Sequence, residues 1–374
     1  MKIAINVWLL RKKKLDGIGV VIKETASRLI EKHPEAEFLI LCDKNFDENY
    51  FDFPNAKKYP IFPPFRHPLL YIFYLEIILP LFLRKHKPDI FLGLDGMGSL
   101  ASNCKQLVCI HDLNFVHQPQ HLDLKNRLYY RFFSKRHAKQ ADRLITVSNY
   151  TKHDIVESYA VSATKIDVMY LGVKALTAAI DPSDIKRKYT SGKDYFLFVG
   201  SLHPRKNIVR LIQAFDLFKK ETGSDFALLL SGDFMWDNAE IKKAFEQAES
   251  HNDIVFSGRL DDSLLGSLYA ASTCVTFVPT FEGFGLPIVE AFSMGTPVIC
   301  SNVTSMPEVA GDAALLVDPY DVSDIKKAMV CIYRNEKNIK EALIEKGKSR
   351  CLLFSWDNAA SLLSGSIQKA LKSS

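Results

Sequence analysis

Two glutamates eight positions apart, Glu282 and Glu290, flank the expected start of a helix. The residues between them include Gly-Phe-Gly-Leu-Pro, so two glycines turn the chain and Pro287 falls in the first turn of a helix that begins near Leu286. The free N–H groups of that turn point toward any ligand held by Glu282. Because one helical turn advances only about 5 Å, both carboxylates can face one hydroxyl-rich ligand. Taken singly, each glutamate also has a purely structural explanation.

The run Glu-Gly-Phe-Gly-Leu-Pro-x-x-Glu resembles the hallmark of the retaining glycosyltransferase family 4, also called group 1. The resemblance spans nearly the whole chain and includes Asp16-Gly17-Ile18-Gly19, the pair His111-Asp112, the loop 200–207 and the run 301–312. Several motifs in this order are far more specific than any one of them, since Gly-x-Gly alone indicates only a tight turn. The resemblance implies an α/β protein of the GT-B fold, in which two Rossmann-like doubly wound domains face a central cleft.

The resemblance also implies how a nucleotide-sugar donor is held. Glu290 would bind the ribose hydroxyls, and Glu282 would bind a hydroxyl of the transferred sugar near its C3. The backbone at Gly17 and Gly19 would approach the diphosphate, on the argument that glycine combines a positive φ with an absent side chain. The expected donor-binding set is Gly17, Gly19, Arg259, Leu260, Phe284, Gly285, Leu286 and Glu290, with Arg259 and Leu260 near the base.

Transfer from such a donor places negative charge on the leaving phosphate, and Arg205 and Lys206 are the expected catalytic cations. Arginine grips phosphate through two parallel hydrogen bonds, and lysine acts as a point charge. Their alternative explanation, an ordinary basic helix start, is weakened because a helix N-terminus disfavours cations. Many relatives carry an arginine directly after the loop glycine, where this chain has Ser201.

His111 follows an apolar run at the expected carboxyl end of a strand, and the resemblance makes it a contact for the transferred sugar or the acceptor. We expect Asp112 to orient His111 or to cap the next segment. The pattern Ser305-x-x-Glu308 is typical of a capping box, so this segment is explained by a capped helix start at least as well as by ligand contact.

The expected mechanism is a front-face displacement, in which the leaving phosphate takes the acceptor proton. The sequence offers no obvious covalent nucleophile and contains no Asp-x-Asp, the usual metal-diphosphate motif of the other major glycosyltransferase architecture. We therefore expect neither a metal nor another cofactor.

Alternating elements position these residues. Mainly apolar runs at 2–8, 38–41, 89–92, 107–110 and 143–147 predict strands of a first parallel sheet, and runs at 195–199, 226–230, 254–256, 274–278 and 298–300 predict a second. Helices are expected from Gly17 to about Ile30, at 208–221 and at 286–294. The predicted domains are an acceptor-binding domain (1–172), a donor-binding domain (173–354) and a C-terminal helix (355–374) that packs back toward the first domain, with Ser355 as its cap.

Composition and charge narrow the class of protein. The chain has 374 residues, 47% of them hydrophobic and 24% charged, which is typical of folded domains and excludes disorder. An odd number of cysteines, seven, and the absence of a Cys-x-x-Cys pair argue against a disulfide framework and against a structural zinc site. Before residue 173 there are 25 Lys and Arg against 18 Asp and Glu, and after it 23 against 25. A basic first half suits an anionic partner, although it can equally serve solubility alone.

The longest apolar stretch, 69–83, is too short to span a membrane and is interrupted by Glu76 and Pro80. Seven apolar residues in it, Tyr71, Phe73, Tyr74, Ile77, Ile78, Leu81 and Phe82, are bracketed by Arg66 and by Arg84, Lys85 and Lys87. The sequence leaves two interpretations open, a helix packed on the first sheet and an anchor on an anionic membrane surface. The charge order at the N-terminus is wrong for a secretory signal, so we expect a cytoplasmic protein, attached peripherally if at all.

The favoured function is a retaining glycosyltransferase for a cell-envelope glycan or lipid-linked acceptor, as in polysaccharide or lipopolysaccharide biosynthesis, with GDP-mannose as the best single donor. We expect no nucleic-acid partner. One alternative is an NAD-dependent oxidoreductase, but the loop at Gly17 lacks the third glycine of the dinucleotide fingerprint. Another is a non-catalytic nucleotide-sugar-binding protein, which would be free to lose Glu282 and Lys206, both present here.

Overall fold

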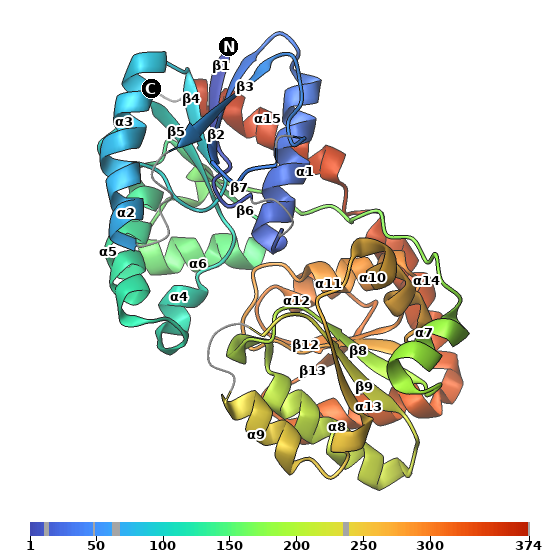
Figure 1. The fold of residues 1–374 in the computed structure, drawn as a ribbon. Coiled ribbons are helices and arrows are strands. Elements are labelled where there is room, and N and C mark those ends of the chain that lie inside the picture. The colour runs from blue at the N-terminus through green and yellow to red at the C-terminus, as the bar shows by residue number, and fades with distance from the viewer. Residues whose placement is uncertain (11–14, 48, 62–67, 235–238, 373–374) are drawn as a thin grey trace. The chain divides into compact units, whose positions relative to one another are not determined.

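The computed structural model describes residues 1–10, 15–47, 49–61, 68–234 and 239–372. The chain forms two compact units, Met1–Gly172 with Ser355–Ser374, and Val173–Phe354. Each unit is a parallel sheet with helices packed against it (Figure 1). No helix among the described residues has the length and apolar character needed to cross a membrane.

The first unit has a seven-stranded sheet in the order β3-β2-β1-β4-β5-β6-β7. Its strands are β1 (Lys2–Asn6), β2 (Glu37–Asp43), β3 (Ala56–Ile61), β4 (Ile90–Gly93), β5 (Lys105–Ile110), β6 (Arg143–Thr146) and β7 (Ile166–Val168). Its helices are α1 (Gly17–Lys32), α2 (Pro68–Phe73), η1 (Tyr74–Ile78), α3 (Leu79–His86), α4 (Asn114–His117), η2 (Pro119–His121), α5 (Leu124–Gln140), α6 (Asn149–Tyr159), η3 (Ala163–Lys165) and α15 (Trp356–Lys372). Strand β3 was not predicted, because this edge strand reads Ala-Lys-Lys-Tyr-Pro-Ile and lacks the apolar run of a central strand.

The second unit has a six-stranded sheet in the order β10-β9-β8-β11-β12-β13. Its strands are β8 (Tyr195–Val199), β9 (Ala227–Ser231), β10 (Ile254–Gly258), β11 (Cys274–Phe277), β12 (Val298–Ser301) and β13 (Leu315–Val317). Its helices are α7 (Pro182–Thr190), η4 (Pro204–Lys206), α8 (Ile208–Thr222), α9 (Ala239–Gln247), η5 (His251–Asp253), α10 (Asp262–Ala271), α11 (Leu286–Ser293), α12 (Met306–Ala310), α13 (Val322–Arg334), η6 (Glu336–Asn338) and α14 (Ile339–Cys351). Helix α7 lies in a polar stretch where no element was predicted.

The C-terminal helix α15 belongs to the first unit, where it packs on α1, β5 and β6. Trp356 lies so close to Gly172 that a Cβ on this glycine would come within 2.3 Å of the tryptophan. Asp167 then joins the helix to the sheet, because its carboxylate accepts hydrogen bonds from Ser366 Oγ at 2.6 Å and Lys369 Nζ at 2.9 Å. Ser355 Oγ accepts the N–H of Asn358 at 3.4 Å, as expected of a cap.

Helices α2, η1 and α3 form one continuous helix from residue 68 to residue 86, interrupted by a π turn. The N–H of Leu79 bonds the carbonyl of Tyr74, five residues earlier. The π turn lies directly before Pro80, whose ring would clash with the carbonyl four residues back in a regular helix. One face of this helix enters the core through Tyr74, Leu75, Leu79 and Leu83, so the core interpretation of this segment is correct for that face.

Candidate active site

In the second unit, the expected catalytic residues lie where the direction of the sheet's connections reverses. The chain runs from β8 outward through β9 to β10, and then returns to place β11 on the other side of β8. The loops after β8 and β11 therefore lie side by side at the carboxyl edge of the sheet, the usual ligand position in doubly wound folds. Arg205 and Lys206 follow β8, and Glu282 follows β11.

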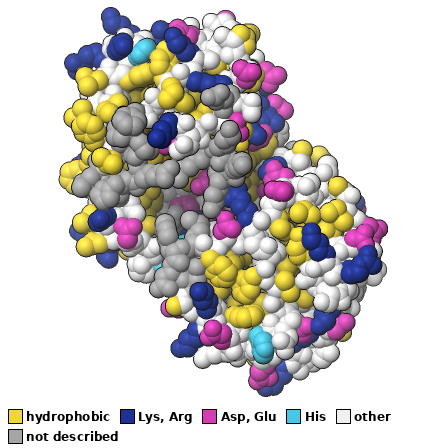
Figure 2. All heavy atoms as spheres, viewed as in Figure 1, with side chains coloured by type: hydrophobic (Ala, Val, Ile, Leu, Met, Phe, Trp, Pro, Cys, Tyr) yellow, Lys and Arg dark blue, Asp and Glu magenta, His cyan; other side chains and the backbone are white. Residues whose placement is uncertain are grey.

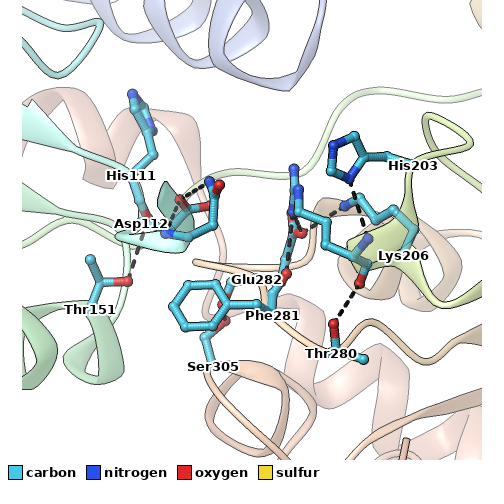
Figure 3. Close-up of polar contacts among 11 residues, drawn as sticks. His111, Asp112, Thr151, His203, Lys206, Thr280, Phe281, Glu282 and Ser305 are labelled. Carbon is cyan, nitrogen blue, oxygen red and sulfur yellow. Dashed lines mark hydrogen bonds and ion pairs between the residues drawn. The ribbon is translucent and has the colours of Figure 1, made fainter. Parts of the chain in front are cut away.

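The structure brings these three side chains into one ion-pair network (Figure 3). Lys206 Nζ donates to Glu282 Oε2 at 2.7 Å, and Arg205 Nη1 donates to the same oxygen and to the carbonyl of Phe281, the latter at 3.3 Å. The side chains of Lys206 and Glu282 are 8% and 16% exposed. Burial alone would raise the pKa of Glu282, but the two cations and their hydrogen bonds hold it below its usual value. Glu282 is therefore an ionised carboxylate that leaves the network with one net positive charge.

Hydrogen bonds to backbone groups fix the loops after β8 and β11 against each other. The N–H of Thr280 bonds the carbonyl of Arg205 at 2.9 Å, so the loop after β11 is held against the loop after β8. Asn207 Nδ2 bonds the carbonyls of Val278 and Pro319 at 3.1 and 2.7 Å. His203 Nδ1 accepts the N–H of Arg205 at 3.3 Å. The two cations are thus held in a braced turn before α8 begins.

The capping box predicted at Ser305 does not form. Ser305 has helical backbone angles and makes no side-chain cap to α12. Its buried hydroxyl instead donates to the carbonyl of Glu282 at 2.9 Å (Figure 3). The predicted pattern fails because a capping serine needs non-helical backbone angles, which Ser305 does not have. Ser305 therefore positions the backbone of Glu282, a role that the sequence did not reveal.

Helix α11 begins at Leu286, as predicted, because Gly285 has a φ of 99° and Pro287 occupies the first turn. No side chain caps the N-terminus of this helix. Phe284, expected in the donor-binding set, is buried and packs edge-on against Phe354 with ring centroids 5.5 Å apart. Its side chain therefore supports the turn from inside the unit, whereas Leu286 is half-buried at the helix start.

Glu290 lies one turn into α11 and has its own partner. Tyr269, on α10, donates its hydroxyl to Glu290 Oε2 at 2.7 Å. Burial raises the pKa of Glu290 in spite of this bond. No pattern in the sequence pointed to Tyr269, because its link to Glu290 depends on how α10 and α11 pack. Arg259 and Leu260 follow β10 at the carboxyl edge of the same sheet, with Arg259 exposed and Leu260 half-buried.

In the first unit, His111 directly follows β5 at the carboxyl edge of the sheet, as expected. Its Nε2–H donates to the carbonyl of Leu94 at 2.8 Å. Burial lowers its pKa, but the Cys109 sulfur and the Leu94 carbonyl favour the charged imidazolium, and the pKa rises to about 9. Asp112 accepts the N–H of Asn114 at 3.0 Å, which matches the capping alternative for this residue (Figure 3).

Gly17 and Gly19 do not have the backbone conformation that we expected. Neither has a positive φ, because both lie in the first turn of α1. Asp16 caps this helix by accepting the N–H of Gly19 at 2.8 Å. The absence of a side chain at Gly19 has a steric reason, because a Cβ there would lie only 3.2 Å from Asp16 Oδ1. Gly17 and Gly19 therefore lack the positive φ that was predicted for them.

A polar cluster that the sequence did not predict lies where the first sheet reverses, between β1 and β4. Asn6, the last residue of β1, donates from Nδ2 to Asp95 Oδ2 at 2.8 Å. Tyr71 donates its hydroxyl to the same oxygen at 2.6 Å. Within the described part of the chain, Asp95 Oδ1 and the Tyr129 hydroxyl are buried without a hydrogen-bond partner. In the sequence, Asn6 stands out as a polar residue at the end of an apolar strand. It indicates a polar cluster only once the strand order shows that β1 lies beside β4.

Two family models match the chain. The model described as "Glycosyltransferase Family 4" matches residues 15–175, and that described as "Glycosyl transferases group 1" matches residues 181–350. The O-antigen chain mannosyltransferase B of Escherichia coli is 33% identical over 259 residues, which cover 68% of each chain. The serotype-specific mannosyltransferase WbdA of Escherichia coli is 28% identical over 284 residues. That match covers 71% of this chain but only 34% of WbdA, so the chain spans about a third of WbdA's length.

Solved structures share the fold. Sucrose-phosphate synthase from Thermosynechococcus elongatus has a TM-score of 0.78 at 19% identity, covering 100% of both chains. HepE of Anabaena, solved in complex with UDP and glucose, has a TM-score of 0.74 at 18% identity, covering 98% of this chain and 99% of that one. The expected GT-B fold with two Rossmann-like units is confirmed. The matches do not support the NAD-dependent oxidoreductase or the non-catalytic binding protein.

Proposed function

The chain belongs to the group 1 glycosyltransferases, and from that membership we propose that it transfers mannose from GDP-mannose to a growing cell-envelope glycan. The choice of mannose and of an O-antigen type of polysaccharide is supported by the names of the relatives, which include an O-antigen chain mannosyltransferase and WbdA. The choice of a nucleotide-sugar donor is supported by HepE, which was solved with UDP-glucose.

The observation that carries the proposal is the network of Arg205, Lys206 and Glu282 at the reversal point of the second sheet. A sugar diphosphate needs fixed positive charge at its phosphates and an acceptor for the sugar hydroxyls. The network supplies both within one braced pair of loops. The carboxylate of Glu282 neutralises one of the two cations. When the donor binds, its phosphates form ion pairs with Arg205 and Lys206 that replace part of their pairing with Glu282.

In the proposed reaction, the bond from sugar C1 to the diphosphate oxygen breaks while a bond from C1 to the acceptor oxygen forms on the same face. The acceptor's hydroxyl proton passes to the leaving phosphate oxygen. Arg205 and Lys206 stabilise the negative charge that develops on the diphosphate, a kind of interaction whose loss typically costs about 10²- to 10³-fold in rate. Glu290 binds the ribose, and His111 contacts the transferred sugar or the acceptor.

We also propose that the reaction needs no metal, since two side-chain cations, Arg205 and Lys206, lie where the diphosphate is proposed to bind. Chelation by EDTA is expected to leave the transfer rate unchanged, and a strict dependence of the purified chain on Mg²⁺ or Mn²⁺ would refute this part of the proposal. The acceptor is proposed to be a lipid-linked glycan, with the chain acting peripherally at the cytoplasmic face of the membrane.

A donor panel tests the function. The purified chain is incubated with a lipid-linked glycan primer and, separately, with GDP-mannose, UDP-glucose, UDP-galactose and ADP-glucose, and the products are examined by mass spectrometry and NMR. We expect transfer from GDP-mannose, with the anomeric configuration of the donor retained. Transfer from a UDP-sugar alone would refute the choice of donor, and an inverted product would refute the front-face mechanism.

A further inference from the structure

The helix formed by α2, η1 and α3 has a second apolar face that the core does not cover. Four large apolar residues on this face are exposed to solvent: Leu70 (41%), Phe73 (47%), Ile77 (48%) and Leu81 (58%). Their spacing of three or four residues places them in one stripe along the helix. Tyr74, which the sequence analysis grouped with them, is fully buried and belongs to the core face. Arg66, grouped with the flanking cations, lies outside the described residues.

Helix α5 carries a second stripe of the same kind. Leu124, Leu128 and Phe132 recur every fourth residue and are 69%, 57% and 51% exposed. Helix α5 packs against α2, where the rings of Tyr71 and Tyr129 lie 6.0 Å apart. The two helices run along the same edge of the first unit (Figure 1), and Figure 2 shows hydrophobic side chains interspersed with Lys and Arg on that edge. We call the two stripes together the apolar face.

Positive charge surrounds the apolar face. Helix α5 contains six Lys and Arg and no Asp or Glu, the cations being Lys125, Arg127, Arg131, Lys135, Arg136 and Lys139. The last turn of α3 adds Arg84 and Lys85. The one carboxylate on these helices, Glu76, is turned inward, where it accepts the N–H groups of Leu100 and Ala101 at 3.1 and 2.9 Å. Eight of the 25 Lys and Arg in the first half of the chain therefore lie on these two helices.

A hollow on α5 is lined by both apolar and positively charged side chains. It is lined by Leu128, Arg131, Phe132 and Arg136. The Arg136 guanidinium lies over the Phe132 ring, 3.8 Å from its centroid. Two guanidinium groups beside two apolar side chains suit a ligand that has a phosphate next to hydrocarbon.

We propose that the apolar face of α2, α3 and α5 binds the surface of a membrane that contains anionic phospholipids. The apolar stripes enter the boundary between headgroups and acyl chains, and the surrounding cations pair with lipid phosphates. A second copy of this chain fits the face poorly, because a two-fold interface would bring two like-charged α5 helices together. The inference rests on the proposed function in one respect, since a lipid-linked acceptor gives the chain a reason to lie on a membrane.

Vesicle cosedimentation tests the proposal with the full chain. The wild-type chain is expected to pellet with vesicles of phosphatidylcholine and phosphatidylglycerol, to bind pure phosphatidylcholine much more weakly, and to be released by high salt. The double variants Phe73→Ser/Ile77→Ser and Leu128→Ser/Phe132→Ser should each lower the partition coefficient by about tenfold or more, because each removes two inserted apolar side chains.

Two further variants make the test specific. Leu352→Ser, which removes an 83% exposed leucine from the second unit, is the matched control and should bind like the wild type. Arg131→Gln/Arg136→Gln changes no apolar residue and should weaken binding only to the vesicles with phosphatidylglycerol. This charge variant keeps the test decisive if an apolar variant fails to fold by circular dichroism.

Absence of wild-type binding at low salt, equal binding to both kinds of vesicle, or wild-type binding by the charge variant would each overturn the proposal. Loss of a dimer in the apolar variants, seen by light scattering, would instead assign the face to a second copy. Thermal shift with GDP-mannose should be unchanged in all these variants. Failure of the wild type to respond to any nucleotide-sugar would refute the proposed function, whereas failure of vesicle binding alone would refute only this surface.

Discussion

Replacing Glu282 by glutamine should destabilise the ligand-free chain and, at the same time, increase its response to a nucleoside diphosphate. The carboxylate is the shared partner of Arg205 and Lys206, and glutamine removes its charge while keeping nearly the same shape. Without a ligand, the two cations lose the negative charge of the carboxylate that they share. A bound diphosphate restores that charge, so the variant gains more from the ligand than the wild type does.

The size of the effect follows from burial. The side chains of Glu282 and Lys206 are 16% and 8% exposed. Breaking a buried charge pair by removing one partner costs about 3–5 kcal/mol, and the amide oxygen that remains as an acceptor favours the lower end, about 3 kcal/mol. For a unit of this size, roughly 2–4 °C per kcal/mol gives a fall of about 6–12 °C in the Tm of the second unit. Transfer should slow by about 10²-fold, because the sugar loses a positioning contact.

Differential scanning fluorimetry with and without GDP measures both stability effects. The matched control is Glu221→Gln, which changes a glutamate of the same unit that also pairs with two cations, Lys326 at 2.5 Å and Arg334 at 3.8 Å. Glu221 is 39% exposed, so water screens its ion pairs and the control should melt close to the wild type.

An unchanged Tm in Glu282→Gln would show that the carboxylate does not balance the two cations. A smaller GDP-induced shift than in the wild type would show that the diphosphate does not take its place. Either result would refute the electrostatic account of this network.

Three further predictions follow from individual contacts. Burial raises the pKa of Glu290, so its carboxylate becomes protonated at a higher pH than an ordinary glutamate does. As the pH decreases, affinity for the nucleotide-sugar should therefore begin to fall above the usual glutamate pKa, and Glu290→Gln should abolish this acid dependence. Arg205→Ala should lower kcat by about 10²- to 10³-fold and change KM much less. Burial alone would raise the pKa of Asp167, but the bonds from Arg143 and Ser366 lower it, so its contribution to stability is present above the usual aspartate pKa and is lost as pH falls below it. Asp167→Asn should therefore cost about 2 kcal/mol at neutral pH and less in acid, as measured by thermal melting.

Each of these predictions has a contradicting result. A binding profile in which Glu290→Gln keeps the acid limb would place the titration on another group. A KM effect of Arg205→Ala larger than its kcat effect would make this arginine a ground-state binding residue. Equal melting of Asp167→Asn and the wild type at neutral pH would show that the Asp167 carboxylate does not help to hold α15 in place.

Local signals predicted the elements that carry the donor site. The start of α11 at Leu286 was predictable because Gly285 and Pro287 determine it within three residues. The central strands were predictable because they are buried on both faces and read as apolar runs. Helix α7 was not predicted, although Asp181 and Pro182 are good signals for a helix start. Its residues are mostly polar, and they lack the regular spacing of apolar residues that indicated the other helices.

Contacts between distant segments were not predictable from the sequence. Ser305 matched a capping pattern, yet its hydroxyl bonds the carbonyl of Glu282, which only the packing of two loops brings within reach. Tyr269 and Asp95 were missed for the same reason, since their partners Glu290 and Asn6 lie on other elements. The edge strand β3 escaped prediction because its solvent-facing residues remove the apolar signal.

Isothermal titration of the chain with GDP-mannose measures whether the chain binds a nucleotide-sugar and whether Glu290 contributes to that binding. We expect saturable binding to the wild type and to Glu221→Gln, and binding at least about tenfold weaker to Glu290→Gln, which loses a charged acceptor for the ribose hydroxyls. Equal affinity of all three proteins, or binding of NAD in place of the nucleotide-sugar, would contradict this expectation.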